Sequence, residues 1–225
     1  MLFDLRARGR RRTVKVVYAL LAVLLGGGLI FFGVGGNVGG GLLDAVNNNK
    51  GGGSGGDLLA KDEQRLEQRI RRNPDNAHLW AELAQIRVQD ATTGANYDQS
   101  TSTYTSSGLA RLRQASNAWD HYLAASPAKP DDAIASVMVQ ALGALGRYAR
   151  ATKAAEIVAA AQPSPGTYEQ LAQYAWAAGQ ESKGDLAADK AVSLAPKAQR
   201  KTVRSQLDSF KSQLSQQAAG TSTTG

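Results

Sequence analysis

The sequence contains no cysteine and only two histidines among its 225 residues. Without cysteine the chain cannot form disulfides, thiolate metal sites or a cysteine nucleophile. The histidines, His78 and His121, are separated by a predicted helix and a loop, a spacing that resembles neither a metal site nor a histidine-based catalytic pair. No set of acid, base and nucleophile residues stands out either. The sequence therefore predicts that the protein is not an enzyme and that it uses no metal or other cofactor.

Little net charge remains once the N-terminal arm is set aside. The chain has a formal net charge of +7 and a pI near 9.7, which would favour nucleic acid as a partner if the basic residues formed a surface. Residues 1–15 supply five of these charges, because six basic residues oppose Asp4 there: Arg6, Arg8, Arg10, Arg11, Arg12 and Lys15. An apolar run follows this basic arm, so we expect a membrane beside it and no nucleic acid.

The run from Val16 to Val34 has 19 residues and no charged side chain. As a helix it would span about 28 Å, close to the thickness of a hydrocarbon core. We predict a transmembrane helix over residues 16–36. A cleaved signal peptide is the alternative, but the run is longer than a signal core and no Ala-x-Ala cleavage site follows promptly. By the positive-inside rule, the arm over residues 1–15 is cytoplasmic and the chain after the span is extracytoplasmic.

Beyond the span, residues 37–56 are rich in glycine and asparagine and have too little apolar area to pack, so we predict a flexible linker. Residues 57–217 then show the helical spacing of apolar residues, with Asp57 as the predicted N-cap of a helix that ends at Arg72. Residues 218–225 are predicted to be a disordered tail.

Two further helices are expected at about residues 75–90 and 109–125, with a polar insertion between them. The insertion, residues 92–107, is too rich in threonine and serine for a helix. A small β-hairpin around Tyr97 and Tyr104 and a disordered segment are both compatible with its sequence.

The later part of the chain repeats itself with a displacement of 33 residues: Gly146, Ala155 and Pro163 recur as Gly179, Ala188 and Pro196. This spacing is similar to that of the tetratricopeptide repeat (TPR), whose usual period is 34 residues. The resemblance implies an all-α fold, a TPR-like α-solenoid of about three helix pairs. A capping helix would follow the last pair, and the transmembrane helix would precede the domain.

The resemblance covers about residues 75–196. Its first unit opens with Trp80, Leu83 and Ala84, which match the large, large and small positions of the family pattern. The chain departs from the pattern at the insertion, and again at Gly184, where the family pattern has alanine. These departures affect the helix geometry more than the architecture.

Three glutamines occupy one equivalent position in the first helices of the three units: Gln85, Gln140 and Gln173. First helices line the concave side of such arrays, so the amides would form a ladder, and amides both donate and accept hydrogen bonds to a peptide backbone. We predict a groove that binds a protein or peptide, with Trp176 and His78 near the ladder. The alternative is that these glutamines are ordinary solvent-facing residues.

The order of basic arm, span, linker and repeat domain resembles the bacterial ancillary subunits of the Sec translocon that carry periplasmic TPRs. This resemblance implies a scaffold or chaperone-like adaptor in the bacterial inner membrane, which binds proteins or peptides on the extracytoplasmic side near the translocon. The alternative is a structural assembly factor of an envelope complex, which would act through its transmembrane helix.

Overall fold

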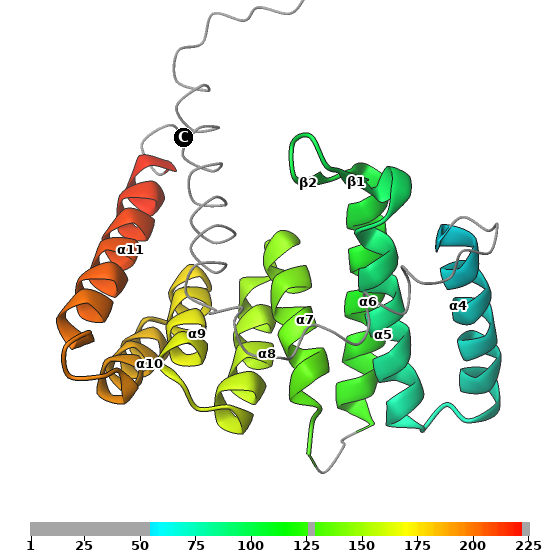
Figure 1. The fold of residues 1–225 in the computed structure, drawn as a ribbon, viewed down its shortest axis with the longest axis horizontal. Coiled ribbons are helices and arrows are strands. Elements are labelled where there is room, and N and C mark those ends of the chain that lie inside the picture. Colours follow the sequence, from blue (N-terminus) through cyan, green and yellow to red (C-terminus); the bar gives the residue numbers. More distant parts are fainter. Residues whose placement is uncertain (1–54, 126–128, 222–225) are drawn as a thin grey trace, which may run out of the picture. The chain divides into compact units, whose positions relative to one another are not determined.

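The computed structural model describes residues 55–125 and 129–221. Within these ranges the fold is all-α, as predicted: eight α-helices follow one another, and a short β-hairpin lies between the second and third (Figure 1). The helices are α4 (Gly55–Arg72), α5 (Ala77–Ala91), α6 (Ser106–Ala124), α7 (Asp132–Ala144), α8 (Tyr148–Ala161), α9 (Pro165–Ala177), α10 (Glu181–Leu194) and α11 (Arg200–Thr221). The 3₁₀ helix η2 (Gly94–Asn96) precedes the hairpin strands β1 (Tyr97–Asp98) and β2 (Thr103–Tyr104).

Three of the predictions lie outside the described residues. They are the basic arm over residues 1–15, the transmembrane helix over residues 16–36, and all but the end of the linker over residues 37–56. Among the helices that are described, none combines the length and the apolar character needed to cross a membrane.

Two predicted boundaries are wrong. Helix α4 begins at Gly55, so Asp57 lies inside the first turn and is not the N-cap. An acidic residue is favourable throughout the first turn because it meets the positive end of the helix dipole, so its presence does not identify one position.

At the other end α11 continues to Thr221, so residues 218–221 are helical and not a disordered tail. Ala218 and Ala219 are strong helix formers, which favours this continuation.

Several helices begin where a short polar side chain accepts hydrogen bonds from free backbone N–H groups. Asn76, Asp131 and Ser164 do so at the starts of α5, α7 and α9. At α9 the side chain of Thr167 bonds back to the N-cap backbone and completes a capping box. Such residues are helix-start signals in the sequence itself, so these starts depend little on tertiary contacts.

The repeated glycines end two helices in the same way. Gly146 follows α7 with φ = 67°, and Gly179 follows α9 with φ = 71°, a conformation that other residues adopt only with strain. In both turns the next residue donates its N–H to the carbonyl five residues earlier, at 2.9 and 2.8 Å. This Schellman arrangement turns the chain back on itself, and it explains why the glycine recurs with the repeat.

Each helix packs on its neighbours along the chain (Figure 1). Helix α5 contacts α6, α7 contacts α8, and α9 contacts α10, which makes three helix pairs. Successive pairs meet through contacts of α6 with α7 and of α8 with α9. Helix α4 packs on α5, and α11 packs on α9 and α10. The first and last described helices therefore cover the two ends of the three pairs.

The core places large side chains against small ones. Leu83, Leu112, Trp119 and Met138 are among the largest fully buried side chains, and fully buried alanines occur on α5 to α10. Small residues let neighbouring helices approach closely, while the large residues fill the space between them. Burial of this kind extends into α11 through Val203, Leu207 and Phe210.

The insertion forms a hairpin, which is one of the two structures that its sequence allows. Tyr97 pairs with Tyr104 across the antiparallel strands, and their rings meet edge to face with centroids 5.3 Å apart. The loop returns to α6 at Gly108, where the Cβ of any other residue would overlap the carbonyl of Asn96. Glycine therefore lets the base of the hairpin lie directly on the helix.

Candidate functional site

The predicted ladder comes from the first helix of each pair: Gln85 lies on α5, Gln140 on α7 and Gln173 on α9. The side chain of Gln140 is exposed, and the other two are half-buried. Within the described ranges, none of the three amides forms a hydrogen bond with another residue. Because α5 contacts α7, and Gly143 of α7 lies against Tyr174 of α9, the three helices are consecutive neighbours. Their amides can bond to a ligand without breaking an internal contact.

Glu169 extends this row and was missed by the sequence analysis. It lies four residues before Gln173 on α9, so both residues are on one face of that helix. Glu169 is only 8% exposed, and its Oε1 has no hydrogen-bond partner among the described residues. Burial raises the pKa of this carboxyl. A buried acceptor without a donor is destabilising in the free protein, and a ligand that brings a donor would remove this cost.

Trp176 is not in the groove where it was predicted. Its side chain is 6% exposed and packs between three helices. The indole Nε1 donates to Asp185 of α10 at 3.0 Å, and the ring stacks on Phe210 of α11 at 6.5 Å between centroids. Gly184 of α10 lies against the same ring, and a Cβ there would overlap it. The departure of Gly184 from the family pattern is therefore what makes room for Trp176, which is a packing residue.

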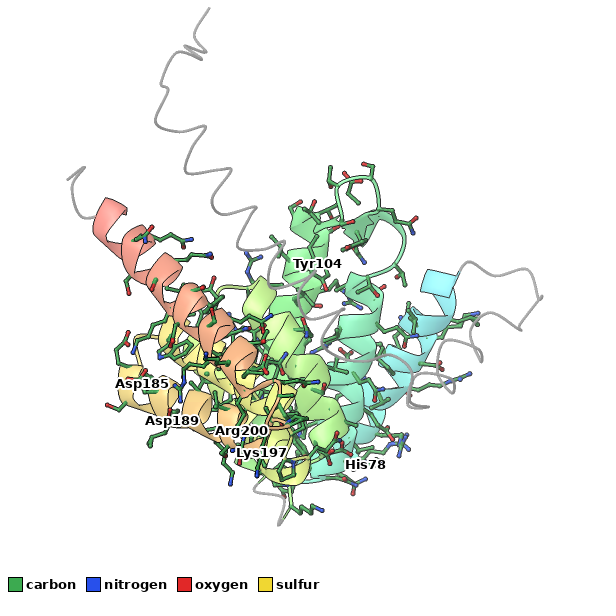
Figure 2. The ribbon with its side chains drawn as sticks, turned by 60° about the vertical axis from the view of Figure 1, so that its left-hand side comes forward. His78, Tyr104, Asp185, Asp189, Lys197 and Arg200 are labelled. Atoms are coloured by element: carbon green, nitrogen blue, oxygen red, sulfur yellow. The ribbon has the colours of Figure 1, made fainter. Side chains whose placement is uncertain are left out.

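His78 lies on the same face of α5 as Gln85, two turns earlier. Its imidazole points away from the ribbon in Figure 2 and is 74% exposed, with Nε2 2.9 Å from a carboxylate oxygen of Glu82. The histidine is thus accessible, but it lies about 10 Å along the helix from the amide ladder. We retain Gln85, Gln140, Gln173 and Glu169 as the candidate site, with His78 at its edge.

A second cluster of charged residues is structural. Glu63 of α4 accepts hydrogen bonds from Arg87 of α5 at 2.7 Å and from Arg111 of α6, and Arg111 also pairs with Asp90. Burial acts to raise the pKa of Glu63. The hydrogen bonds from Arg111 and Arg87 lower this pKa by more than burial raises it, so the pKa lies below its ordinary value. Each charge has an opposite partner, so the cluster attaches α4 to the first helix pair.

The described part of the chain shows no group of three or more histidine and acidic side chains that could hold a metal ion. Comparison with models of known protein families matches none of them, and comparison with curated proteins finds no significantly similar sequence. The candidate site therefore rests on the geometry of the glutamine row and Glu169.

Proposed function

We propose that this protein is a membrane-anchored adaptor whose TPR-like α-solenoid binds a segment of a partner protein along the first helices of its pairs. The observation that carries this proposal is the row of unpaired amides of Gln85, Gln140 and Gln173 on three consecutive first helices. Amides with free donors and acceptors suit the backbone of a peptide, which offers both.

Three features support the TPR-like architecture. The helices contact each other pair by pair in chain order, the turns within the second and third pairs share a left-handed glycine, and these glycines are 33 residues apart. In this arrangement α11 acts as the capping helix, because its apolar side chains cover α9 and α10. An array of this kind exposes a long surface to which an extended segment can bind.

In the proposed arrangement residues 16–36 span the bacterial inner membrane, the basic arm is cytoplasmic and the helix pairs are extracytoplasmic. The support is the uncharged 19-residue run and the arginines that precede it. Partners would be exported chains or components of the Sec translocon, which lie on that side of the membrane, and the activity would be scaffolding or chaperone-like.

The test is site-specific photocrosslinking in intact cells. A photoreactive amino acid placed at Gln140 or at Gln173 should capture the same partner, because both positions would contact one bound segment. Gln206 is the matched control, since it is an exposed glutamine on the capping helix. Capture of nothing at Gln140 and Gln173, or of the same proteins at Gln206 with equal yield, would refute the proposal.

The competing function is that of an envelope assembly factor acting through the span. The feature that favours it is the triplet Gly26–Gly28 within the apolar run, because small residues let transmembrane helices pack closely. Replacing residues 16–34 with an unrelated span separates the two functions. Crosslinking at Gln140 should survive the exchange if the helix pairs carry the activity, and it should be lost if the span does.

A further inference from the structure

An open pocket of about 480 Å³ lies where the turn between α7 and α8 meets the end of α9. The charged side chains in its lining are Arg147 and Arg150, both from the start of α8. Tyr148 also lines the pocket, and Ala177 and Ala178 close the side at the end of α9. The pocket thus combines two arginine residues with enough room for a ligand side chain.

A buried hydroxyl group holds both guanidinium groups in place. Ser116 of α6 is fully buried, and its Oγ accepts hydrogen bonds from Nη1 of Arg147 at 2.7 Å and from Nη1 of Arg150 at 3.2 Å. Fixing the two arginines in this way reduces the conformational entropy that they would lose on binding a ligand. The pocket is therefore organised before any ligand arrives.

The charges in the pocket are not balanced. Asp120 accepts a hydrogen bond from Nη1 of Arg150 at 2.8 Å, whereas Arg147 pairs with no carboxylate among the described residues. The Nε and Nη2 groups of both arginines also donate to no described residue. One positive charge and several donors remain, and the planar guanidinium fork matches the two oxygens of a carboxylate.

The pocket lies close to the glutamine row along the chain. Gln140 is six residues before Gly146, and Gln173 is four residues before Ala177, which corresponds to about 9 Å and about 6 Å along their helices. A peptide bound to these glutamines and running toward the C-terminal ends of α7 and α9 would reach the pocket within a few residues.

We propose that the pocket of Arg147 and Arg150 binds a carboxylate of the partner segment, and so selects acidic peptides. This inference rests on the proposed function for the nature of the ligand, but its chemistry is independent of the glutamines. Recognition combines charge compensation of Arg147 with hydrogen bonds from both guanidinium groups, while Ser116 positions the two arginines and does not touch the ligand.

The experiment measures peptide binding to the full-length chain in mild detergent by fluorescence anisotropy. The probes are a labelled peptide that contains several glutamates and has an amidated C-terminus, its glutamine counterpart, its phosphoserine counterpart, and a neutral peptide with a free C-terminal carboxylate. We expect the glutamate peptide or the free-carboxylate peptide to bind more tightly than the glutamine peptide. Tighter binding of the glutamate peptide means that a side-chain carboxylate enters the pocket, and tighter binding of the free-carboxylate peptide means that a terminal carboxylate does.

The double variant Arg147→Gln, Arg150→Gln should weaken that binding by about tenfold or more, since hydrogen bonds to charged groups are involved. Arg113→Gln is the control, because Arg113 is exposed on α6 and forms no hydrogen bond or ion pair with another described residue. It removes one positive charge from the surface and should leave the affinity within about twofold. Circular dichroism of each variant checks that the helices remain folded.

Equal affinity of the wild-type protein for all four peptides, or equal affinity of the double variant and Arg113→Gln, would overturn the inference. Tighter binding of the phosphoserine peptide than of both carboxylate peptides would overturn it as well, because the site would then select phosphate. If the double variant does not fold, the comparison of peptides on the wild-type protein still decides. Photocrosslinking at Gln140 and Gln173 tests the proposed function separately, so the two can fail independently.

Discussion

Replacing Glu63 by glutamine should loosen the attachment of α4 to the first helix pair. The substitution keeps the shape of the side chain and removes the charge that Arg87 and Arg111 share. These three side chains are 12%, 14% and 23% exposed, so water can replace the lost partner only in part. The two arginines would then face each other with less compensation.

The size of the effect follows from the partners that remain. Removing one member of a buried ion pair destabilises a protein by about 3–5 kcal/mol. Here Arg87 keeps its pair with Glu67 at 2.8 Å, and Arg111 keeps Asp90. The neutral amide of glutamine can still accept one hydrogen bond. We therefore expect a loss of about 2–3 kcal/mol in the free energy of unfolding.

The assay is urea unfolding of the full-length chain, followed by circular dichroism at several pH values. Because the pKa of Glu63 is lowered in the folded state, its stabilising effect is complete above its ordinary value of 4.5 and is lost as the pH falls below it. The difference between wild type and Glu63→Gln should thus be largest near neutral pH and shrink in acid. Asp62→Asn is the control, since Asp62 pairs with Arg65 at the surface at 3.2 Å.

The control should change the free energy of unfolding by less than about 0.5 kcal/mol. Two results would refute the reasoning. One is a Glu63→Gln protein as stable as the Asp62→Asn control near neutral pH. The other is a loss of stability that stays the same from neutral pH to below the ordinary pKa of a glutamate, because a charge effect must disappear when the carboxylate is protonated.

Three further substitutions test other parts of the fold in the same unfolding assay. Gly184→Ala should lower the free energy of unfolding by about 1–3 kcal/mol, because the new methyl group overlaps the ring of Trp176. Gly166→Ala, where nothing lies within 4 Å of the new methyl group, should be neutral or stabilising, and equal effects at both positions would contradict this packing. Gly146→Ala should cost about 1 kcal/mol through its positive φ, and an unchanged midpoint would mean that the turn differs. At pH values above the raised pKa of Glu169, Glu169→Gln should stabilise the protein by about 1 kcal/mol, and this gain should vanish as the pH falls below that pKa. A loss of stability near neutral pH would show that the carboxylate has a partner.

Sequence alone determined the helices, because their signals are local. Asn76 and Ser164 cap helices with their own side chains, and Gly146 and Gly179 end helices through a conformation that favours glycine. The 33-residue displacement of the glycines followed from the same turn being used twice. The hairpin of the insertion was one of two possibilities in the sequence, since two-residue strands form only when other parts of the chain support them.

Only the tertiary structure decided which surfaces are free and which are covered. Helical periodicity places Trp176 on a face of α9, but it does not say that α10 and α11 cover that face, so the indole that was expected in the groove is buried between helices. A sign of the buried charge cluster was present, since Glu63 occurs on the apolar stripe of Leu59, Leu66 and Ile70. Its partners, however, are 24 and 48 residues away. Ser116 and Arg147 likewise meet only when α6 packs beside the next helix pair, because ionic and polar contacts of this kind depend on distances that local sequence does not encode.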